Sequence, residues 1–402
     1  MRVENPGSVP RIPVTLLAAL ALATMAGPLS IDTYLPAFPV MAQDLGTTDP
    51  MVQLTLTMFM AGMALGQFFI GPMSDSLGRR RLLVASQVLA AVAAFVCALA
   101  PDVYVMLGGR LVQGIAGGAG VVLARAVVAD LAVGKQAARA FSLMMMINGL
   151  APILAPLIGA VLLGPFGWRS IFVFMGVFNV VAAGVLAAVV RESLPPERRS
   201  AGGLRGLIAG IATVSRIPGF LGFAATFWFG FGAMFAYISG SPFVMQGQLG
   251  LGPGTYSLVF AASSAMIVLG TFVSARLAGT VDPARLLAAG VILLLGGSLL
   301  LLADALFALT LWIIVALLMA CMFGMAFIMG NATALATGIA RERAGAASAM
   351  LGAGQFVVAG VVSPMVGLGA NAAITMGAVM SVSATIALAG YLWAARAREV
   401  RA

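Results

Sequence analysis

The sequence predicts an all-α membrane protein with twelve transmembrane helices, arranged as two pseudo-symmetric six-helix bundles. Three observations lead to this prediction. Of the 402 residues, 61% are hydrophobic and 9% are charged, whereas a soluble domain carries about 25% charged residues. Apolar segments close to the roughly 20 residues needed to cross a bilayer recur along the whole chain. The second half of the chain also repeats features of the first.

The apolar segments between loop signals define the expected helices. They are long and continuous, whereas the strands of a membrane barrel would be short and alternate in polarity. The first run, which begins at Ile12, resembles a signal peptide but is too long for one, so we expect it to be the first span. The expected spans are 12–40, 51–73, 82–100, 104–129, 140–163, 170–190, 218–245, 255–277, 285–303, 306–338, 346–367 and 373–394.

The basic residues predict the orientation of these spans. An even number of spans places both termini on one side, and assigning that side to the cytoplasm puts 19 of the 22 basic residues in cytoplasmic segments. This is the asymmetry that the positive-inside rule describes. Arg169 alone falls in an outer loop, while Arg110 and Arg125 fall within a span. The net charge of +9 therefore reflects topology, and no nucleic-acid partner is expected.

A long loop divides the chain into two halves. A shift of 204 residues aligns Leu65-Gly66 with Leu269-Gly270, and Arg81-Leu82-Leu83 with Arg285-Leu286-Leu287. One constant offset predicts two parallel bundles with a site between them at mid-membrane, as in secondary transporters. The expected parts are an N-terminal bundle, a cytoplasmic linker and a C-terminal bundle, at 1–190, 191–217 and 218–402.

Asp32 is the leading candidate for a functional side chain. It is the only charge between Arg11 and Asp44, in a stretch long enough to span the membrane. A carboxylate there costs a few kcal/mol or more, so such a residue normally faces a cavity and serves a function. No other acid is expected inside a span and the chain has no histidine, so Asp32 is the expected proton carrier. The alternative is a hydrated position at the outer end of an irregular helix, which nearby prolines would produce.

Arg110 is the expected partner of Asp32, because a buried guanidinium needs a counter-charge. The functional interpretation is a pair that separates when Asp32 is protonated, and the alternative is a fixed structural ion pair. Arg125 lies about four turns further along the same span. We expect it either to extend toward the cytoplasm or to pair with Asp130.

Two further segments carry a recognisable spacing. The stretch from Gly71 to Arg81 joins the second and third spans, where Asp75 can cap a helix and the arginines hold the loop at the cytoplasmic face. The fifth span carries residues that permit bending or close helix packing, with close packing alone as the alternative; they are Pro152, Pro156 and Gly159.

Several polar and aromatic side chains inside spans are candidates for lining a substrate pocket. They are Tyr34, Asn148, Phe227, Trp228 and Tyr237. With two isolated cysteines and no histidine, the sequence predicts no metal site and no bound cofactor.

These motifs resemble the major facilitator superfamily. Asp75 with Gly71, Gly78, Arg79 and Arg80 resembles its loop signature. Arg110-xx-Gln113-Gly114 resembles its fourth-helix motif, and Ala151 to Ala160 a relaxed form of its fifth-helix antiporter motif. The segment Pro28-Leu-Ser-Ile-Asp32-Thr-Tyr34-Leu-Pro36-Ala-Phe-Pro39 resembles the first-helix signature of the bicyclomycin/chloramphenicol-resistance (Bcr/CflA) exporters. The resemblance is densest through residues 28–199.

The resemblance implies the major facilitator fold and drug/proton antiport by alternating access, with coupling at Asp32 and Arg110. It makes the loop residues Gly71, Asp75, Gly78, Arg79 and Arg80 a conformational latch. The implied substrates are small amphiphilic antibiotics such as chloramphenicol- or bicyclomycin-like compounds, and the implied energy source is the proton gradient. The expected substrate contacts are Asp32, Tyr34, Gln113, Asn148, Phe227, Trp228 and Tyr237.

Together these features predict a monomer in the bacterial inner membrane. Some residues depart from the family pattern: Ala155 and Ala160 replace glycines of the antiporter motif, and Ala129 replaces an arginine frequent in these exporters. An exporter of an endogenous metabolite or amino acid is the alternative, and a non-transporting membrane sensor is a more distant one. An enzyme is not expected, because the sequence offers no nucleophile, base and orienting group together.

Overall fold

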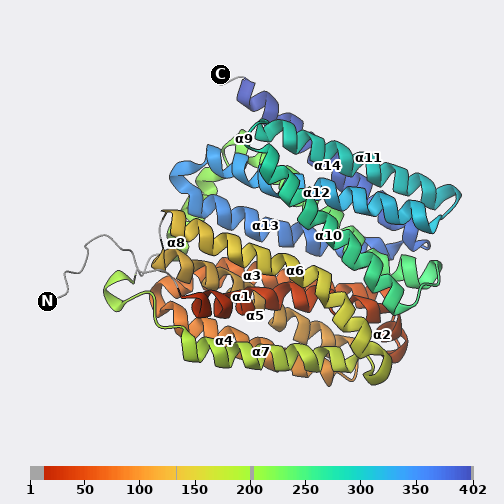
Figure 1. Ribbon diagram of the computed structural model, residues 1–402, viewed down its shortest axis with the longest axis horizontal. Helices are drawn as coiled ribbons and strands as arrows, with labels where there is room; N and C mark the ends of the chain where they lie inside the picture. The colour runs from red at the N-terminus through yellow and green to blue at the C-terminus, as the bar shows by residue number, and fades with distance from the viewer. Residues whose placement is uncertain (1–12, 133, 200–202, 400–402) are drawn as a thin grey trace.

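The computed structural model describes residues 13–132, 134–199 and 203–399, and within them every regular element is a helix (Figure 1). Twelve helices of this part are long and apolar enough to cross a membrane, which confirms the predicted class. The helices are α1 (Val14–Asp32), α2 (Phe38–Asp44), α3 (Asp49–Leu77), α4 (Arg79–Ala98), α5 (Val103–Leu131), α6 (Gly134–Phe166), α7 (Arg169–Val189), α8 (Gly203–Val214), α9 (Pro218–Pro242), α10 (Pro253–Leu277), α11 (Pro283–Phe307), α12 (Leu311–Ile339), α13 (Ala344–Met365) and α14 (Ala372–Glu399).

Short helical turns link several of these helices. They are η1 (Leu35–Ala37), η2 (Pro196–Arg198), η3 (Phe243–Gln248), η4 (Arg341–Arg343) and η5 (Val366–Leu368). The first span is the predicted irregular helix: α1 ends at Asp32, and the chain continues through η1 into α2. Pro36 and Pro39 lie in the first turns of η1 and α2, where a missing backbone N–H is tolerated.

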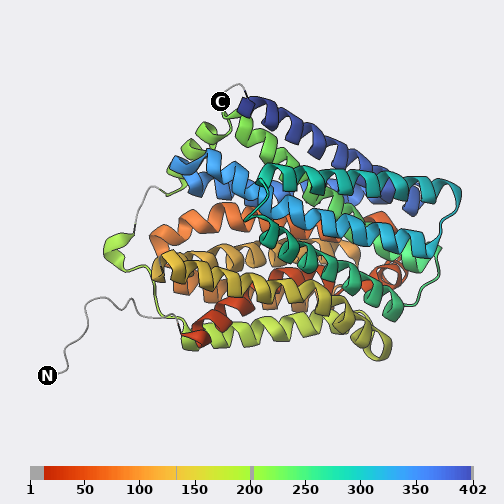
Figure 2. The same ribbon diagram turned by 45° about the horizontal axis from the view of Figure 1, so that its top comes forward.

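The helices lie in two groups that we call the N-terminal half (α1–α7) and the C-terminal half (α9–α14) (Figures 1 and 2). Within the first, α5 packs between α3 and α4, and α1 packs against α5, α6 and α7. Within the second, α9 packs against α12, α13 and α14. The halves meet along α3 with α13 and along α6 with α10. The exact domain boundaries at residues 190 and 218 stay a prediction.

The two ends of the helical assembly differ in composition. The end at which α3 turns into α4, where α8 lies, carries Arg79, Arg80 and Arg81; we call it the basic end. The opposite end carries α2, η3 and η5; we call it the α2 end (Figure 1). The helix α8 contacts both α3 and α13 and so touches both halves at the basic end. The assignment of the basic end to the cytoplasm stays a prediction.

Glycines allow α3 and α5 to approach closely. A Cβ atom on Gly114 would overlap the carbonyl oxygen of Phe59, and one on Gly62 would overlap the carbonyl oxygen of Leu111. Small residues at a helix interface let the backbones meet in this way. The contact brings Arg110, one turn before Gly114, beside Phe59.

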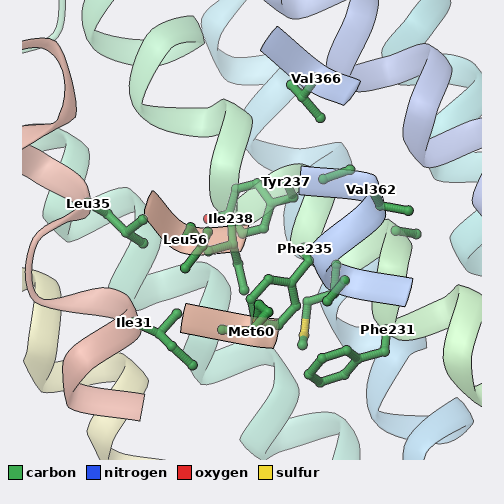
Figure 3. Close-up of a cluster of buried hydrophobic side chains, with 14 of the residues drawn as sticks. Ile31, Leu35, Leu56, Met60, Phe231, Phe235, Tyr237, Ile238, Val362 and Val366 are labelled. Atoms are coloured by element: carbon green, nitrogen blue, oxygen red, sulfur yellow. The ribbon is translucent and has the colours of Figure 1, made fainter. Parts of the chain in front are cut away.

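The two halves are sealed against each other toward the α2 end by apolar side chains (Figure 3). The ring centroids of Phe38 and Phe243 lie 5.8 Å apart across the boundary. Nearby, the Gln53 side-chain amide donates to the Ser239 carbonyl oxygen at 3.1 Å, which joins α3 to α9. The sealing side chains include Ile31, Leu35, Leu56 and Met60 of one half and Phe231, Phe235, Tyr237, Ile238, Val362 and Val366 of the other.

Candidate functional site

Asp32 is buried at the break in the first span. Its residue is 4% exposed, and its Oδ1 atom has no hydrogen-bond partner among the described residues. The following residue continues the turn, because the Thr33 hydroxyl donates to the Leu29 carbonyl oxygen at 2.6 Å. Asp32 therefore lies inside the protein, and the alternative of a hydrated outer helix end is not what the structure has.

Arg110 on α5 is completely buried and is surrounded by aromatic rings. Its guanidinium carbon lies 4.3 Å from the ring centroid of Phe59, 4.4 Å from that of Tyr34 and 5.9 Å from that of Phe172. Its Nη1 atom donates to Oε1 of Gln113 at 2.7 Å, while Nε and Nη2 have no partner among the described residues. Ring faces stabilise a desolvated cation through their quadrupole.

The predicted ion pair between Asp32 and Arg110 is wrong for this structure. The ion pairs among the described residues join Arg79 to Asp75 and Asp130, and Arg169 to Asp44, and leave both Asp32 and Arg110 without one. The turn that follows α1 places the ring of Tyr34, rather than the carboxyl group of Asp32, over the guanidinium. The spacing of residues along the sequence predicted that Asp32 and Arg110 both lie within spans. It could not predict which side chain the turn after Asp32 would direct toward Arg110.

Tyr34 and Gln113 are held inside the N-terminal half. The hydroxyl groups of Tyr34 and Thr55 lie 3.2 Å apart. The Gln113 amide nitrogen donates to Ser30 Oγ at 3.3 Å, while its oxygen accepts from Arg110. Gln113 therefore links α5 to α1 and orients the guanidinium.

Two tyrosines of the C-terminal half lie near the break in the first span. They are Tyr237 of α9 and Tyr256 of α10. Both tyrosines are buried, and η1, three residues after Asp32, contacts α9 and α10. Sequence analysis singled out Tyr237 but missed Tyr256. The available signal was the spacing of polar residues along α10, which is hard to recognise because many other spans also carry serines.

Helix α6 supports the same region from the other side. The Asn148 amide nitrogen donates to Thr24 Oγ1 at 3.0 Å, and its oxygen has no partner among the described residues. The helix is continuous through Pro152 and Pro156. Gly159 lies directly against the backbone carbonyl of Thr33, where a Cβ atom would overlap it. The fifth-span motif therefore packs against the residue that follows Asp32.

Phe227 and Trp228 lie at a different depth from Asp32. They precede Tyr237 on α9 by about ten residues, or about 15 Å along the helix. The Phe227 ring stacks with Phe231 at 6.5 Å, and the Trp228 indole N–H donates to the Leu351 carbonyl oxygen at 3.1 Å. The structure therefore places these two candidates within the C-terminal half, away from the break in the first span.

The segment Gly71–Arg81 forms a sharp turn at the basic end. Helix α3 runs to Leu77 and α4 begins at Arg79, so Gly78 alone makes the turn, with φ +93°. Gly71 lies within α3, where a Cβ atom would approach Val122 of α5 at 3.3 Å. A glycine is required at position 78 because this conformation is strained for other residues.

Arg79 is the centre of the turn's polar contacts. Its Nη2 atom lies 2.6 Å from Asp75 Oδ1 and its Nε atom 3.2 Å from Asp130 Oδ2, while Nη1 donates to Ser74. The predicted role of Asp75 as a helix cap is wrong: Asp75 lies in the last turn of α3 and uses its carboxylate for Arg79. Asp130 is therefore bound to Arg79, and the alternative pairing of Arg125 with Asp130 is not formed; Arg125 is exposed.

Glu192 is a functional candidate that sequence analysis missed. Its carboxylate accepts hydrogen bonds from the backbone N–H groups of Arg79 at 2.8 Å, Leu194 at 3.1 Å and Arg80 at 3.3 Å. Burial acts to raise the pKa of Glu192, but these amides and nearby Arg199 outweigh it and hold the pKa below its ordinary value. The sequence did carry a signal for this contact. Glu192 follows the sixth span directly and so is expected at the same end of the molecule as Arg79, Arg80 and Arg81.

Arg80 ties the same turn to α7. Its Nε atom donates to the Val190 carbonyl oxygen at 2.7 Å and its Nη2 atom to that of Ala187 at 2.8 Å. These carbonyls belong to the C-terminal end of α7, where a cation is favourable. The turn is thereby attached to the N-terminal half alone.

A cavity of about 500 Å³ opens at the α2 end between the halves. Its charged lining residue is Asp49, and the glutamines Gln43, Gln53 and Gln248 supply amide groups. The apolar seal described above separates this cavity from Phe227 and Trp228 further along α9.

These features define a polytopic membrane protein, and comparison with known proteins gives the family, which is one of transporters rather than enzymes. The profile of the Major Facilitator Superfamily matches residues 20–364, so the chain belongs to that superfamily. A relative in Bacillus subtilis (strain 168), named "Uncharacterized MFS-type transporter YdgK", is 34% identical over 386 residues and covers 96% of each chain.

Two other comparisons extend this result. The "Bicyclomycin resistance protein homolog" of Haemophilus influenzae is 28% identical over 357 residues, covering 87% of this chain and 88% of the relative. The crystal structure of a bacterial homologue of the human lysosomal transporter Spinster, in an inward-facing and occupied conformation, has a TM-score of 0.76 at 16% identity and covers 98% of each chain. The structural likeness shows the fold, and the Haemophilus relative is named for drug resistance.

Proposed function

We propose that this protein exports small amphiphilic drugs in exchange for protons, by alternating access between its two halves. The observation that carries the proposal is Asp32, a carboxyl group buried between helices without an ion pair. Burial in a low-dielectric region favours the neutral, protonated form of a carboxyl group. A group of this kind can take a proton on one side and give it up on the other.

In this proposal, Asp32 and Arg110 exchange partners during the cycle. The guanidinium rests among Tyr34, Phe59 and Phe172 while Asp32 is protonated. Loss of the proton leaves a carboxylate for which Arg110 is the buried cation available on the neighbouring helix. Two free donor atoms on Arg110, Nε and Nη2, support this role.

The turn around Gly78 acts as the conformational latch. Gly71, Asp75, Gly78, Arg79 and Arg80 hold α3 and α4 in a fixed relation, and α3 is also the helix that meets α13 of the other half. Pro152, Pro156 and Gly159 serve gating by letting α6 move against α10 and the first span.

Tyr34, Gln113, Asn148, Phe227, Trp228 and Tyr237 are proposed as the substrate contacts, together with Asp32. Aromatic faces and a few amide groups suit amphiphilic compounds. The name of the Haemophilus relative supports a bicyclomycin-like antibiotic as the substrate class. Export of an endogenous metabolite or amino acid by the same machinery is the second candidate, because the site contains no group that selects for antibiotics alone.

The proposed setting is the bacterial inner membrane, with the basic end and both termini in the cytoplasm and the protein as a monomer. The positive-inside rule supports this orientation, because Arg79, Arg80 and Arg81 gather at one end.

Drug susceptibility tests the proposal. In a host lacking its own exporters, expression of the wild type should raise the inhibitory concentration of at least one compound in a broad panel, and Asp32→Asn should abolish that increase. Inverted membrane vesicles should show substrate-dependent proton movement with the wild type alone. If the wild type changes no compound's potency, the drug-export proposal fails; if Asp32→Asn still concentrates substrate, proton coupling through Asp32 fails.

A further inference from the structure

A cluster of buried hydroxyl groups lies between α9 and α10. The side chains of Ser241 and Tyr256 lie 3.2 Å apart, and the ring of Tyr237 stacks on Phe260 at 5.4 Å. The hydroxyl groups of Tyr237 and Ser263 lie near each other without meeting hydrogen-bond geometry. Tyr237 and Ser241 are one helical turn apart on α9, as are Tyr256 and Phe260 on α10, so these side chains share the facing sides of the two helices.

This hydroxyl cluster is fully enclosed, yet part of its hydrogen-bonding capacity is unused. Tyr237 is 1% exposed, and Ser263 is completely buried. Neither the Tyr237 hydroxyl nor the Ser263 hydroxyl has a hydrogen-bond partner among the described residues, and the same holds for Oδ1 of Asp32. A buried polar group without a partner costs about 1–3 kcal/mol, so three of them in one region indicate a functional reason.

The cluster and Asp32 belong to different halves and meet at the seal. Asp32 ends α1, and the turn after it packs against α9 and α10. Figure 3 shows Tyr237 in the same cluster as Ile31, the residue before Asp32, and as Leu35 and Leu56. The buried Asp32 carboxyl group and the buried Tyr237 hydroxyl therefore lie on opposite sides of one boundary, and the two sides part when the halves separate at the α2 end.

The other charged groups near Asp32 are few. On α5, Arg110 lies behind the ring of Tyr34. On the described parts of α6, α7, α9 and α10, the charged residues Arg139, Arg169 and Arg276 all lie at helix ends. On α3, Asp49 and Asp75 lie in its first and last turns. Within the membrane, the titratable groups nearest to the break at Asp32 are thus Tyr237 and Tyr256 across the boundary and, beyond Tyr34, Arg110.

Resting on the proton-coupled function above, we propose that Tyr237 is the partner of protonated Asp32 in the C-terminal half, joined to it through one bridging water molecule that Ser263 helps to hold. Three polar groups suffice to hold such a water molecule. The hydrogen bond forms when the α2 end is closed and is lost when it opens. Tyr237 is thus a positioning residue that makes closure of the α2 end depend on the protonation of Asp32.

The direction of this coupling follows from the hydrogen bonding. With Asp32 protonated, the closed state holds a neutral polar group that hydrogen-bonds across the boundary. With Asp32 ionised, the carboxylate turns to Arg110 of its own half, as proposed above, and the closed state loses the hydrogen bond that protonated Asp32 makes across the boundary. Proton uptake at Asp32 therefore favours closure at the α2 end, and proton loss favours its opening.

The distance between two labels across the α2 end, measured against pH in the purified full-length protein in lipid nanodiscs, tests this proposal. Cysteines introduced at Gln43 and Ala370 suit the labels, because both positions are exposed and line the cavity from opposite halves. The native Cys97 and Cys321 are buried. In the otherwise wild-type protein, the fraction of molecules with the short label distance should increase as the pH falls. A plot of this fraction against pH should have a single midpoint.

Tyr237→Phe keeps the ring on Phe260 and removes the hydroxyl. Its midpoint should fall by about one pH unit, the size expected from the loss of one hydrogen bond. Ser263→Ala should shift the midpoint in the same direction by less, and Asp32→Asn should remove the pH dependence. Tyr391→Phe, a change of the same chemistry in α14, should keep the wild-type midpoint.

Phenylalanine keeps the packing of Tyr237 and removes only its hydroxyl group. If the midpoint is unchanged in Tyr237→Phe and in Ser263→Ala, these hydroxyl groups do not couple closure to protonation and the proposal is wrong. This result is separable from failure of the proposed function. The wild type could transport no drug and still close its α2 end at low pH in a manner that depends on Asp32. The drug-export proposal would then be wrong, and the midpoints of the Tyr237 and Ser263 variants would still decide the role of Tyr237.

Discussion

Two arginines of the N-terminal half are buried in opposite ways. Arg79, at the start of α4, is 8% exposed and contacts two carboxylates. Arg110, in the third turn of α5, is completely buried and contacts rings and one amide, with no carboxylate among the described residues. A cation enclosed by its counter-charges fixes one geometry, whereas a cation held by ring faces remains able to accept a new partner. The comparison distinguishes a polar network of fixed geometry at the basic end from a cation inside the membrane that can change its partner.

Arg110→Leu should have the largest effect and should act on transport alone. Replacing a buried charge by an apolar side chain of similar size is often neutral or stabilising. We expect substrate-driven proton movement in vesicles to fall by about 100-fold or more, the scale of losing a group that acts in proton transfer. Thermal stability in detergent should be unchanged or higher. Retained transport in this variant would show that Arg110 is structural.

Arg79→Leu should lower stability and also transport, because Arg79 belongs to the proposed latch. It leaves Asp75 and Asp130 without their shared cation, and both carboxylates are only partly exposed. The free energy of unfolding should fall by about 2 kcal/mol, less than for a fully buried pair because water screens the site. Arg81→Leu, which removes an exposed arginine two positions away, should change stability by less than about 0.5 kcal/mol. Equal losses of stability in Arg79→Leu and Arg81→Leu would show that the contacts of Arg79 with Asp75 and Asp130 do not stabilise the fold.

Gly159→Ala tests whether packing, rather than charge, places Asp32. The added methyl group overlaps the Thr33 carbonyl, so the end of α1 must shift. We expect a loss of about 1–2 kcal/mol in stability together with reduced transport, as for other overpacked contacts. Gly164→Ala on the same helix meets nothing within 4 Å and should leave both properties unchanged. Thermal denaturation and transport in vesicles, measured on both variants, test this prediction. Wild-type stability and transport in Gly159→Ala would show that this contact does not place Asp32.

Glu192→Gln should have the smallest effect, which is present at neutral pH and disappears at acid pH. The folded protein holds the pKa of Glu192 below its ordinary value of 4.5, so the stability it contributes is present above that pH and is lost as the pH falls through the lowered value. The wild type should lose this contribution, less than about 1 kcal/mol for such an exposed group, below about pH 4.5. Glu192→Gln lacks it at every pH. The control is Glu197→Gln in the same linker, which should retain the wild-type acid limb of a stability-versus-pH curve.

Much of the architecture could be predicted from the sequence because membrane insertion leaves a plain compositional trace. Twelve apolar segments and the irregular first span, with Pro36 and Pro39 after Asp32, are matched by the structure. The Arg110–Gln113 contact is also implied by a spacing of three residues on a helix.

The contacts between elements could not be predicted in the same way. The side of α1 that faces Arg110 depends on a turn at Thr33 and Tyr34, which spacing does not encode. Tyr256 and Ser263 carry no charge, so they resemble ordinary span residues until α9 and α10 are placed opposite Asp32. The role of Asp75 depends on where α3 ends, and the helix extends further than its glycine and proline suggest.

The hydrogen bond from Gln53 to α9 has a consequence for how the two halves can diverge in evolution. Its acceptor is the main-chain oxygen of Ser239, which every amino acid possesses. Side-chain changes at position 239 that fit the available space would therefore preserve the contact, while most changes at position 53 would abolish it. Constraint on this hydrogen bond therefore falls on position 53 of α3, and the side chain at position 239 of α9 can change without breaking the link between the halves.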